Sequence, residues 1–146
     1  MKKALALIVI VFMAAASISY AGVVPTTQVS KILENKASLV LTDSQLKKLE
    51  IVERSAQQKM MEARAQADIR LSEIERFTSN WTNMNSQSVS SLVKEYFGFL
   101  EDYKMAELDA IIKARAILEY DQLSKFQQLV SIQTLMLHME QELAIR

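Results

Sequence analysis

The chain has 146 residues, with 17 basic and 17 acidic side chains, no cysteine, two glycines and one proline. The balanced charge favours no nucleic-acid partner, and without cysteine no disulfide stabilises the fold. Phosphate-cradling loops need clustered glycines, and tight β-hairpin turns need special residues at strained positions. The composition therefore excludes the common nucleotide-binding loops, disfavours an all-β fold and predicts one all-α domain.

Residues 1–21 have the pattern of a secretory signal peptide. Lys2 and Lys3 precede an uncharged apolar run, and Ser19 and Ala21 are small residues suited to signal peptidase. The run is short compared with the roughly 20 residues of a membrane span. We expect cleavage after Ala21, export to the periplasm and no stable membrane insertion after cleavage. The remaining chain carries 15 basic and 17 acidic side chains, a net charge of −2.

The next part divides into an irregular N-terminal segment over 22–41, with a short helix over 28–36, and a helical hairpin domain over 42–146. The domain begins with a capping box, in which Thr42 accepts a hydrogen bond from the Gln45 amide and the Gln45 side chain reaches back. Leu41 occupies the preceding hydrophobic-staple position. Nothing in the sequence stops this helix before about residue 78.

Apolar residues along this helix recur with spacings of three, four, four, three, four, four and three. The pattern is an eleven-residue repeat, which predicts a nearly straight or weakly right-handed packing seam. Several members are alanine, so a partner helix can approach closely. The seam consists of Leu49, Val52, Ala56, Met60, Ala63, Ala67, Leu71 and Ile74.

The polar stretch over 79–88 predicts the turn between two long helices, the second running over about 87–118. Long helices joined by a short break should fold back antiparallel. The segment 121–145 is also helical by pattern, either as a continuation or as a separate helix after a kink near 119–121. One hairpin cannot cover both faces of such long helices, so we expect a homodimer.

The helix-start residues 41–45, Leu-Thr-Asp-Ser-Gln, resemble the Leu-Thr-x-x-Gln (LTxxQ) motif of the Spy/CpxP family of periplasmic chaperones. A second copy is recognisable at Leu118 and Gln122, although Glu119 stands in place of Thr and Tyr120 in place of the common Pro. The full capping box is therefore absent there. The resemblance covers about residues 39–130. It implies a hairpin that dimerises into a curved cradle, binds unfolded clients without ATP, or senses envelope stress or metals.

Aromatic residues gather near the predicted turn. We expect them to form a small core that locks the turn, with an exposed patch for apolar clients as the alternative. The candidate client-binding residues are Met61, Trp81 and Phe97, because Met61 and Phe97 lie off the predicted buried faces and flexible thioethers suit adaptable surfaces.

The only histidine, His138, has Glu142 four residues later on the same helix face. This pair is the candidate metal site, for zinc or nickel, although tight sites usually need three or more protein ligands. A solvent-exposed histidine without metal is the simpler interpretation, so we expect no cofactor. The carboxylates follow the spacing of a solvated helix face, and we expect no catalytic activity.

These features predict a periplasmic, ATP-independent chaperone or envelope-stress adaptor whose partners are unfolded or envelope proteins. Two alternatives stay open. One is a periplasmic metal-binding sensor or resistance protein, and the other is a non-catalytic structural helical module of the envelope.

Overall fold

The computed structural model describes residues 24–144, with side chains described as far as residue 137. Its helices are α2 (Gln28–Glu34), α3 (Asp43–Thr78), α4 (Ser86–Ile117) and α5 (Tyr120–Ala144). No strand occurs within these limits, so the all-α prediction is confirmed. None of the helices described is both long enough and apolar enough to cross a membrane. The predicted signal peptide lies outside the described residues.

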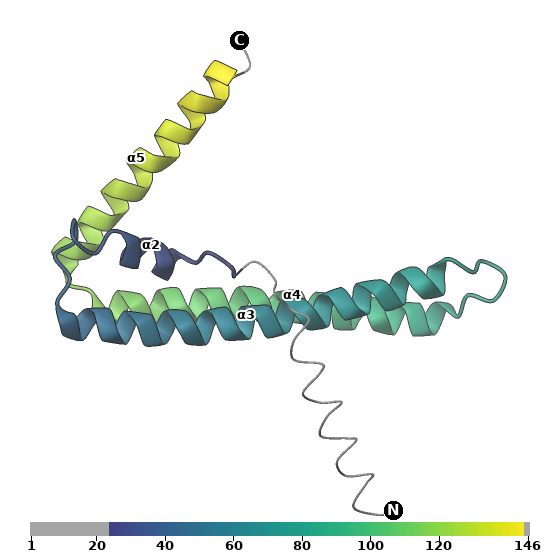
Figure 1. The fold of residues 1–146 in the computed structure, drawn as a ribbon. Coiled ribbons are helices and arrows are strands. Elements are labelled where there is room, and N and C mark those ends of the chain that lie inside the picture. The colour runs from purple at the N-terminus through teal and green to yellow at the C-terminus, as the bar shows by residue number, and fades with distance from the viewer. Residues whose placement is uncertain (1–23, 145–146) are drawn as a thin grey trace, which may run out of the picture.

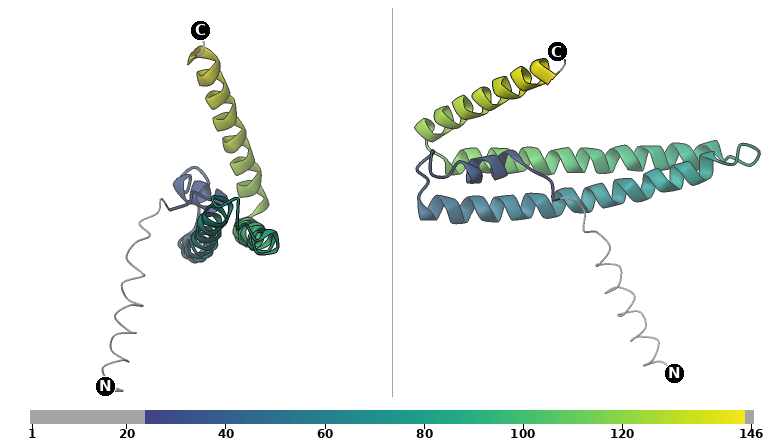
Figure 2. Two further views of the ribbon diagram at one scale, coloured as in Figure 1. Left: turned by 90° about the vertical axis from the view of Figure 1, so that its right-hand side faces the viewer. Right: turned by 45° about the horizontal axis from the view of Figure 1, so that its top comes forward.

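The two long helices form the predicted antiparallel hairpin (Figure 1). α3 and α4 pack along each other and are joined at one end by the bend over 79–85. α2 lies across both helices toward the opposite, open end. α5 starts at this open end and points away from the hairpin (Figure 2). The segment after α4 is therefore a separate helix and not a continuation.

Each of the first three described helices begins at a side-chain cap. Thr27 accepts hydrogen bonds from two amides of α2, and Ser30 completes a capping box with it. Thr42 and Gln45 form the predicted capping box of α3. Asn85 accepts hydrogen bonds at 3.1 Å from the amides that follow it, so α4 begins one residue earlier than the sequence pattern indicated. These caps satisfy amides that have no partner inside the helix.

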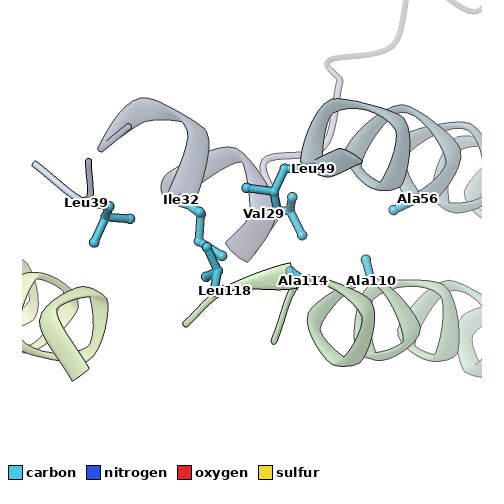
Figure 3. Close-up of a cluster of buried hydrophobic side chains, with 8 residues drawn as sticks. All are labelled: Val29, Ile32, Leu39, Leu49, Ala56, Ala110, Ala114 and Leu118. Carbon is cyan, nitrogen blue, oxygen red and sulfur yellow. The ribbon is translucent and has the colours of Figure 1, made fainter. Parts of the chain in front are cut away.

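The apolar core lies where α2 covers the hairpin near its open end (Figure 3). Alanines on both long helices allow close approach there, and α2 covers the junction with Val29 and Ile32. Five members of the predicted seam are fully buried, but Leu71 is exposed, which contradicts the prediction for that position. The buried cluster consists of Val29, Ile32, Leu39, Leu49, Ala56, Ala110, Ala114 and Leu118.

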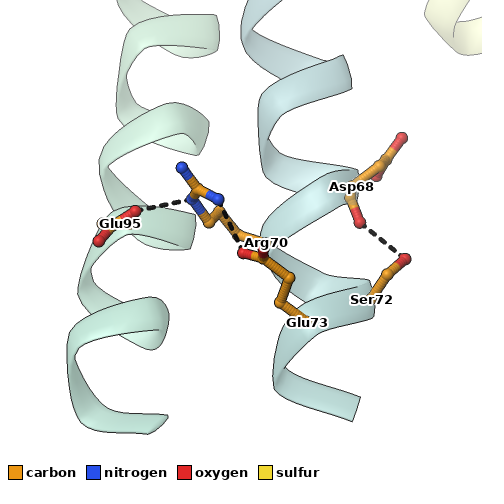
Figure 4. Close-up of polar contacts among 5 residues, drawn as sticks. All are labelled: Asp68, Arg70, Ser72, Glu73 and Glu95. Atoms are coloured by element: carbon orange, nitrogen blue, oxygen red, sulfur yellow. Dashed lines mark hydrogen bonds and ion pairs between the residues drawn. The ribbon is translucent and has the colours of Figure 1, made fainter. Parts of the chain in front are cut away.

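Toward the bend, an ion pair links the two long helices. Arg70 Nη1 lies 2.7 Å from Glu73, and Arg70 Nε lies 2.7 Å from Glu95 on the facing helix (Figure 4). The latter is a charge contact, because the Nε–H does not point along a hydrogen bond. The hydrogen bond with Glu73, reinforced by the charge of Glu95, raises the pKa of Arg70 above its usual value. Leu71 lies in the part of α3 beyond Ala67, where no described residue is fully buried.

The predicted aromatic core at the bend is wrong. Trp81 is 90 % exposed, Phe77 and Phe97 are also exposed, and the neighbouring aromatics of α4 are only half-buried. With a bend of only seven residues between the helices, the aromatic rings have no third element to pack against among the helices of residues 24–144. The bend therefore leaves apolar surface open to solvent.

Candidate functional site

The two motif glutamines, Gln45 and Gln122, meet at the open end of the hairpin and form a reciprocal hydrogen-bonded pair, here called the glutamine pair. Gln45 Nε2 donates to Gln122 Oε1 at 2.8 Å, and Gln122 Nε2 donates to Gln45 Oε1 at 3.2 Å. Gln45 Nε2 also donates to the Ile117 carbonyl at 3.1 Å, and Gln122 Nε2 to the Leu39 carbonyl at 3.3 Å. Each glutamine thus donates a hydrogen bond to a backbone carbonyl that lies within a few residues of the start of the other glutamine's helix.

Each glutamine also caps its own helix. The Thr42 amide donates to Gln45 Oε1 at 3.0 Å, and the Glu119 amide donates to Gln122 Oε1 at 3.0 Å. At the second copy only this half of the capping box is present, because Glu119 replaces the hydroxyl residue. The helix breaks at this point, with Leu118 in an extended conformation and α5 beginning at Tyr120, while Gln45 holds Gln122 in place. The predicted motif residues are therefore brought together by the fold.

The buried carboxylate of Glu53 on α3 forms hydrogen bonds with residues at the start of α2. The sequence analysis did not identify this contact. Glu53 is only 7 % exposed and accepts hydrogen bonds from the hydroxyls of Thr27 and Ser30 and, at 2.7 Å, from Gln57 Nε2. Three donors on one carboxylate compensate for its loss of water. The sequence offered one sign that Glu53 is buried: it lies four residues after Leu49 and three before Ala56, on the same helix face as the predicted seam.

One face of the hairpin carries an open groove of about 760 Å³ between α3 and α4. Its apolar surface comes from residues such as Ala63, Phe99 and Met105, and charged side chains of both signs line it as well. Among these, Asp109 accepts a hydrogen bond from Lys113 Nζ at 2.7 Å, which lowers the pKa of the Asp109 carboxyl. The mixture of shallow apolar and charged surface suits weak polypeptide contacts better than enclosure of a small molecule.

The outer side of α4 exposes four large apolar side chains at spacings of eight, three and four residues, which place them on one helix face. We call this set the α4 stripe: Phe97, Met105, Leu108 and Ile112. Phe97 is 61 % exposed and Ile112 is 59 % exposed, with the other two close to half. The spacing follows the same eleven-residue period as the buried seam, so the sequence carried a signal for it. Sequence reasoning identified only Phe97.

The three predicted client-binding residues do not form one site. Phe97 belongs to the α4 stripe, Trp81 lies in the bend, and Met61 is on α3. All three are exposed, Met61 least so, and none lines the groove.

His138 and Glu142 belong to the last turns of α5, where side chains lie outside the described residues. The metal site therefore stays a prediction. Among the residues whose side chains are described, no group of three or more His, Cys, Asp or Glu residues is arranged to hold a metal ion.

Comparison of the chain with protein-family models, with curated proteins and with solved structures finds no significant match.

Proposed function

We propose that this protein is an ATP-independent chaperone or stress adaptor of the bacterial periplasm that binds unfolded segments of other proteins. The observation that carries this proposal is the α4 stripe, with four large apolar side chains each about half exposed or more. Several large apolar side chains exposed on one helix face of a folded protein are a feature of interaction sites.

Charged residues interleave with the stripe and support reversible binding. Glu101 and Lys104 lie between its members in sequence, and Lys104 pairs with Glu107 at 3.0 Å. The Glu107 hydrogen bond raises the pKa of Lys104 above its usual value. An unfolded segment would gain apolar contact along the stripe while charged side chains keep the surface soluble.

The test is light scattering of a chemically denatured client protein, diluted into buffer with the purified protein, no nucleotide and a chelator. We expect suppression of aggregation near stoichiometric ratios. Ile112→Glu should lose most of the suppression, because it places a charge in the stripe. Ile69→Glu is the matched control, since Ile69 is an exposed isoleucine on α3, outside the stripe. Equal suppression by both variants would place client binding elsewhere, and absence of suppression by the wild-type protein would refute the proposal.

A further inference from the structure

The end of the hairpin at the bend carries large apolar side chains that no other described helix covers. Trp81 is 90 % exposed, and Phe77 and Met84 beside it are exposed as well. Of the helices between residues 24 and 144, α2 and the start of α5 lie toward the opposite end of the hairpin (Figures 1 and 2). The open groove between α3 and α4 includes no residue of the bend. The three side chains form a small convex apolar surface, here called the bend tip.

A long segment without charge surrounds the bend tip. Residues 77–93 contain no acidic or basic side chain, although 23 % of the chain is charged. On each long helix the first charged residue away from the bend is basic, Arg76 on α3 and Lys94 on α4, and both are exposed. The first carboxylates, Glu75 and Glu95, each lie one residue further from the bend. The hairpin thus ends in an uncharged tip that is followed first by basic side chains.

Hydroxyl groups in and beside the bend form local hydrogen bonds. The hydroxyls of Thr78 and Ser79 donate to backbone carbonyls of α3, each at 2.8 Å. The Thr82 hydroxyl donates to Asn80 Oδ1 at 2.7 Å. Polar groups that are bonded in this way lose less free energy on leaving bulk water than unpaired groups do. These bonds therefore favour entry of the bend into a partly dehydrated layer.

We propose that the bend tip docks on an anionic phospholipid bilayer, with Trp81 at the level of the lipid headgroups. Tryptophan favours this level because its ring is apolar and its indole N–H bonds to polar partners. The irregular backbone of the bend stays in the hydrated headgroup layer, since lipid-exposed loops do not enter the hydrocarbon region. Arg76 and Lys94 then lie near the negative surface of the bilayer. The contact is peripheral and requires none of the described helices to cross the membrane.

A lipid surface fits the bend tip better than a polypeptide does. A peptide gains affinity from a groove or an extended face, and the bend tip is the rounded end of a hairpin (Figure 1). A fluid bilayer closes around a small convex surface of this kind. The α4 stripe, which we propose for clients, is interleaved with charged residues, whereas the bend tip is not. Docking on lipid therefore does not depend on the proposed client binding.

Trp81 is the only tryptophan of the chain, so its fluorescence reports on the bend alone. The purified protein is titrated with vesicles of phosphatidylcholine and phosphatidylglycerol, and the emission and its quenching by acrylamide are followed. We expect the vesicles to shift the emission to shorter wavelength and to weaken the quenching. Unchanged emission and quenching would overturn the proposal. A shift produced by a chemically denatured client but not by vesicles would assign the bend tip to polypeptides, and would overturn it as well.

A matched pair of glutamate substitutions tests whether the bend makes the contact. Met84→Glu should raise the vesicle concentration at half-maximal shift by at least about tenfold, because it removes apolar contact and places a negative charge at an anionic surface. Ile51→Glu makes the same change of net charge at an exposed residue of α3 toward the open end, and should bind as wild type. Equal binding by the two variants would overturn the assignment to the bend tip.

A second matched pair tests the basic residues. Arg76→Gln combined with Lys94→Gln should weaken binding by at least about fivefold, the effect of one basic residue at an anionic surface. Lys47→Gln combined with Lys48→Gln removes the same charge at the start of α3, about 45 Å from the bend. This control should bind as wild type, because charges are screened over about 10 Å in 0.1 M salt. Equal weakening by both double variants would show a non-specific charge effect and would overturn the proposed orientation.

Discussion

The glutamine pair should act as one energetic unit, although its members lie 77 residues apart in sequence. We consider Gln45→Ala, Gln122→Ala and the double variant. Each single change removes both reciprocal amide hydrogen bonds, the bond to a backbone carbonyl and the bond from a helix-start amide. In a partly solvated site we take the lower part of the usual range, about 0.5–1 kcal/mol per bond, so each single variant should lose about 2–4 kcal/mol of unfolding free energy.

The coupling between the two sites follows from the bonds that they share. Both single variants lose the same two reciprocal bonds, so the double variant should be less destabilised than the sum by about 1–2 kcal/mol. The measurement is urea unfolding followed by circular dichroism, with constant m-values as a check on two-state behaviour. Gln58→Ala is the control, because Gln58 is an exposed glutamine of α3 whose side chain bonds only to nearby Glu62. It should change stability by less than about 0.5 kcal/mol. Coupling below about 0.3 kcal/mol would show that the pair does not act cooperatively and would refute the reasoning.

Glu53→Ala should destabilise the protein by about 2–3 kcal/mol in the same urea assay, because the hydroxyls of Thr27 and Ser30 lose their shared acceptor. Glu53→Gln keeps the shape but not the charge and should lose an intermediate amount, so a Gln variant as stable as wild type would contradict a charge-assisted role. Val40 has a φ of 52°, which is costly for a β-branched residue. Val40→Asn should therefore raise stability by about 1 kcal/mol in thermal unfolding, and a loss would show that the valine side chain matters more than its strain. The hydrogen bond with Lys113 lowers the pKa of Asp109 in the folded protein. The pair therefore stabilises the fold fully at pH values above the ordinary carboxyl pKa. This stabilisation is lost as the pH falls through the lowered pKa of Asp109 in the folded state. Asp109→Asn should flatten the acid side of the stability profile, and an unchanged profile below pH 4 would exclude this contribution.

Much of the architecture could be predicted from local patterns. The capping box at Thr42, the eleven-residue seam and the polar bend fixed the start, the buried face and the end of α3 to within a few residues. Each of these features depends on residues close together in the sequence, so it can be predicted without knowing the tertiary structure. The seam prediction failed only toward the bend, at Leu71, which lies beyond the last fully buried residue of α3.

The candidate site was less accessible from sequence. Phe97 was identified as exposed, but the rest of the α4 stripe was not recognised until the exposure of each residue was known. The role of Glu53 was hidden for a different reason, because its hydroxyl partners lie 23 and 26 residues away. From the sequence alone, a carboxylate on a helix is predicted to face solvent. Its burial becomes apparent only when the structure shows that a distant segment covers it.

The sequence by itself determined the helical class and the cap at Thr42, because helix formation depends on contacts within about four residues. Only the tertiary structure decided that α5 breaks away from α4, since half of a capping box is a weak stop signal unless Gln45 holds Gln122 in place. The tertiary structure also decided which apolar faces are buried and which are left open. That outcome depends on which helix packs against which, and a periodic pattern on one helix cannot specify it.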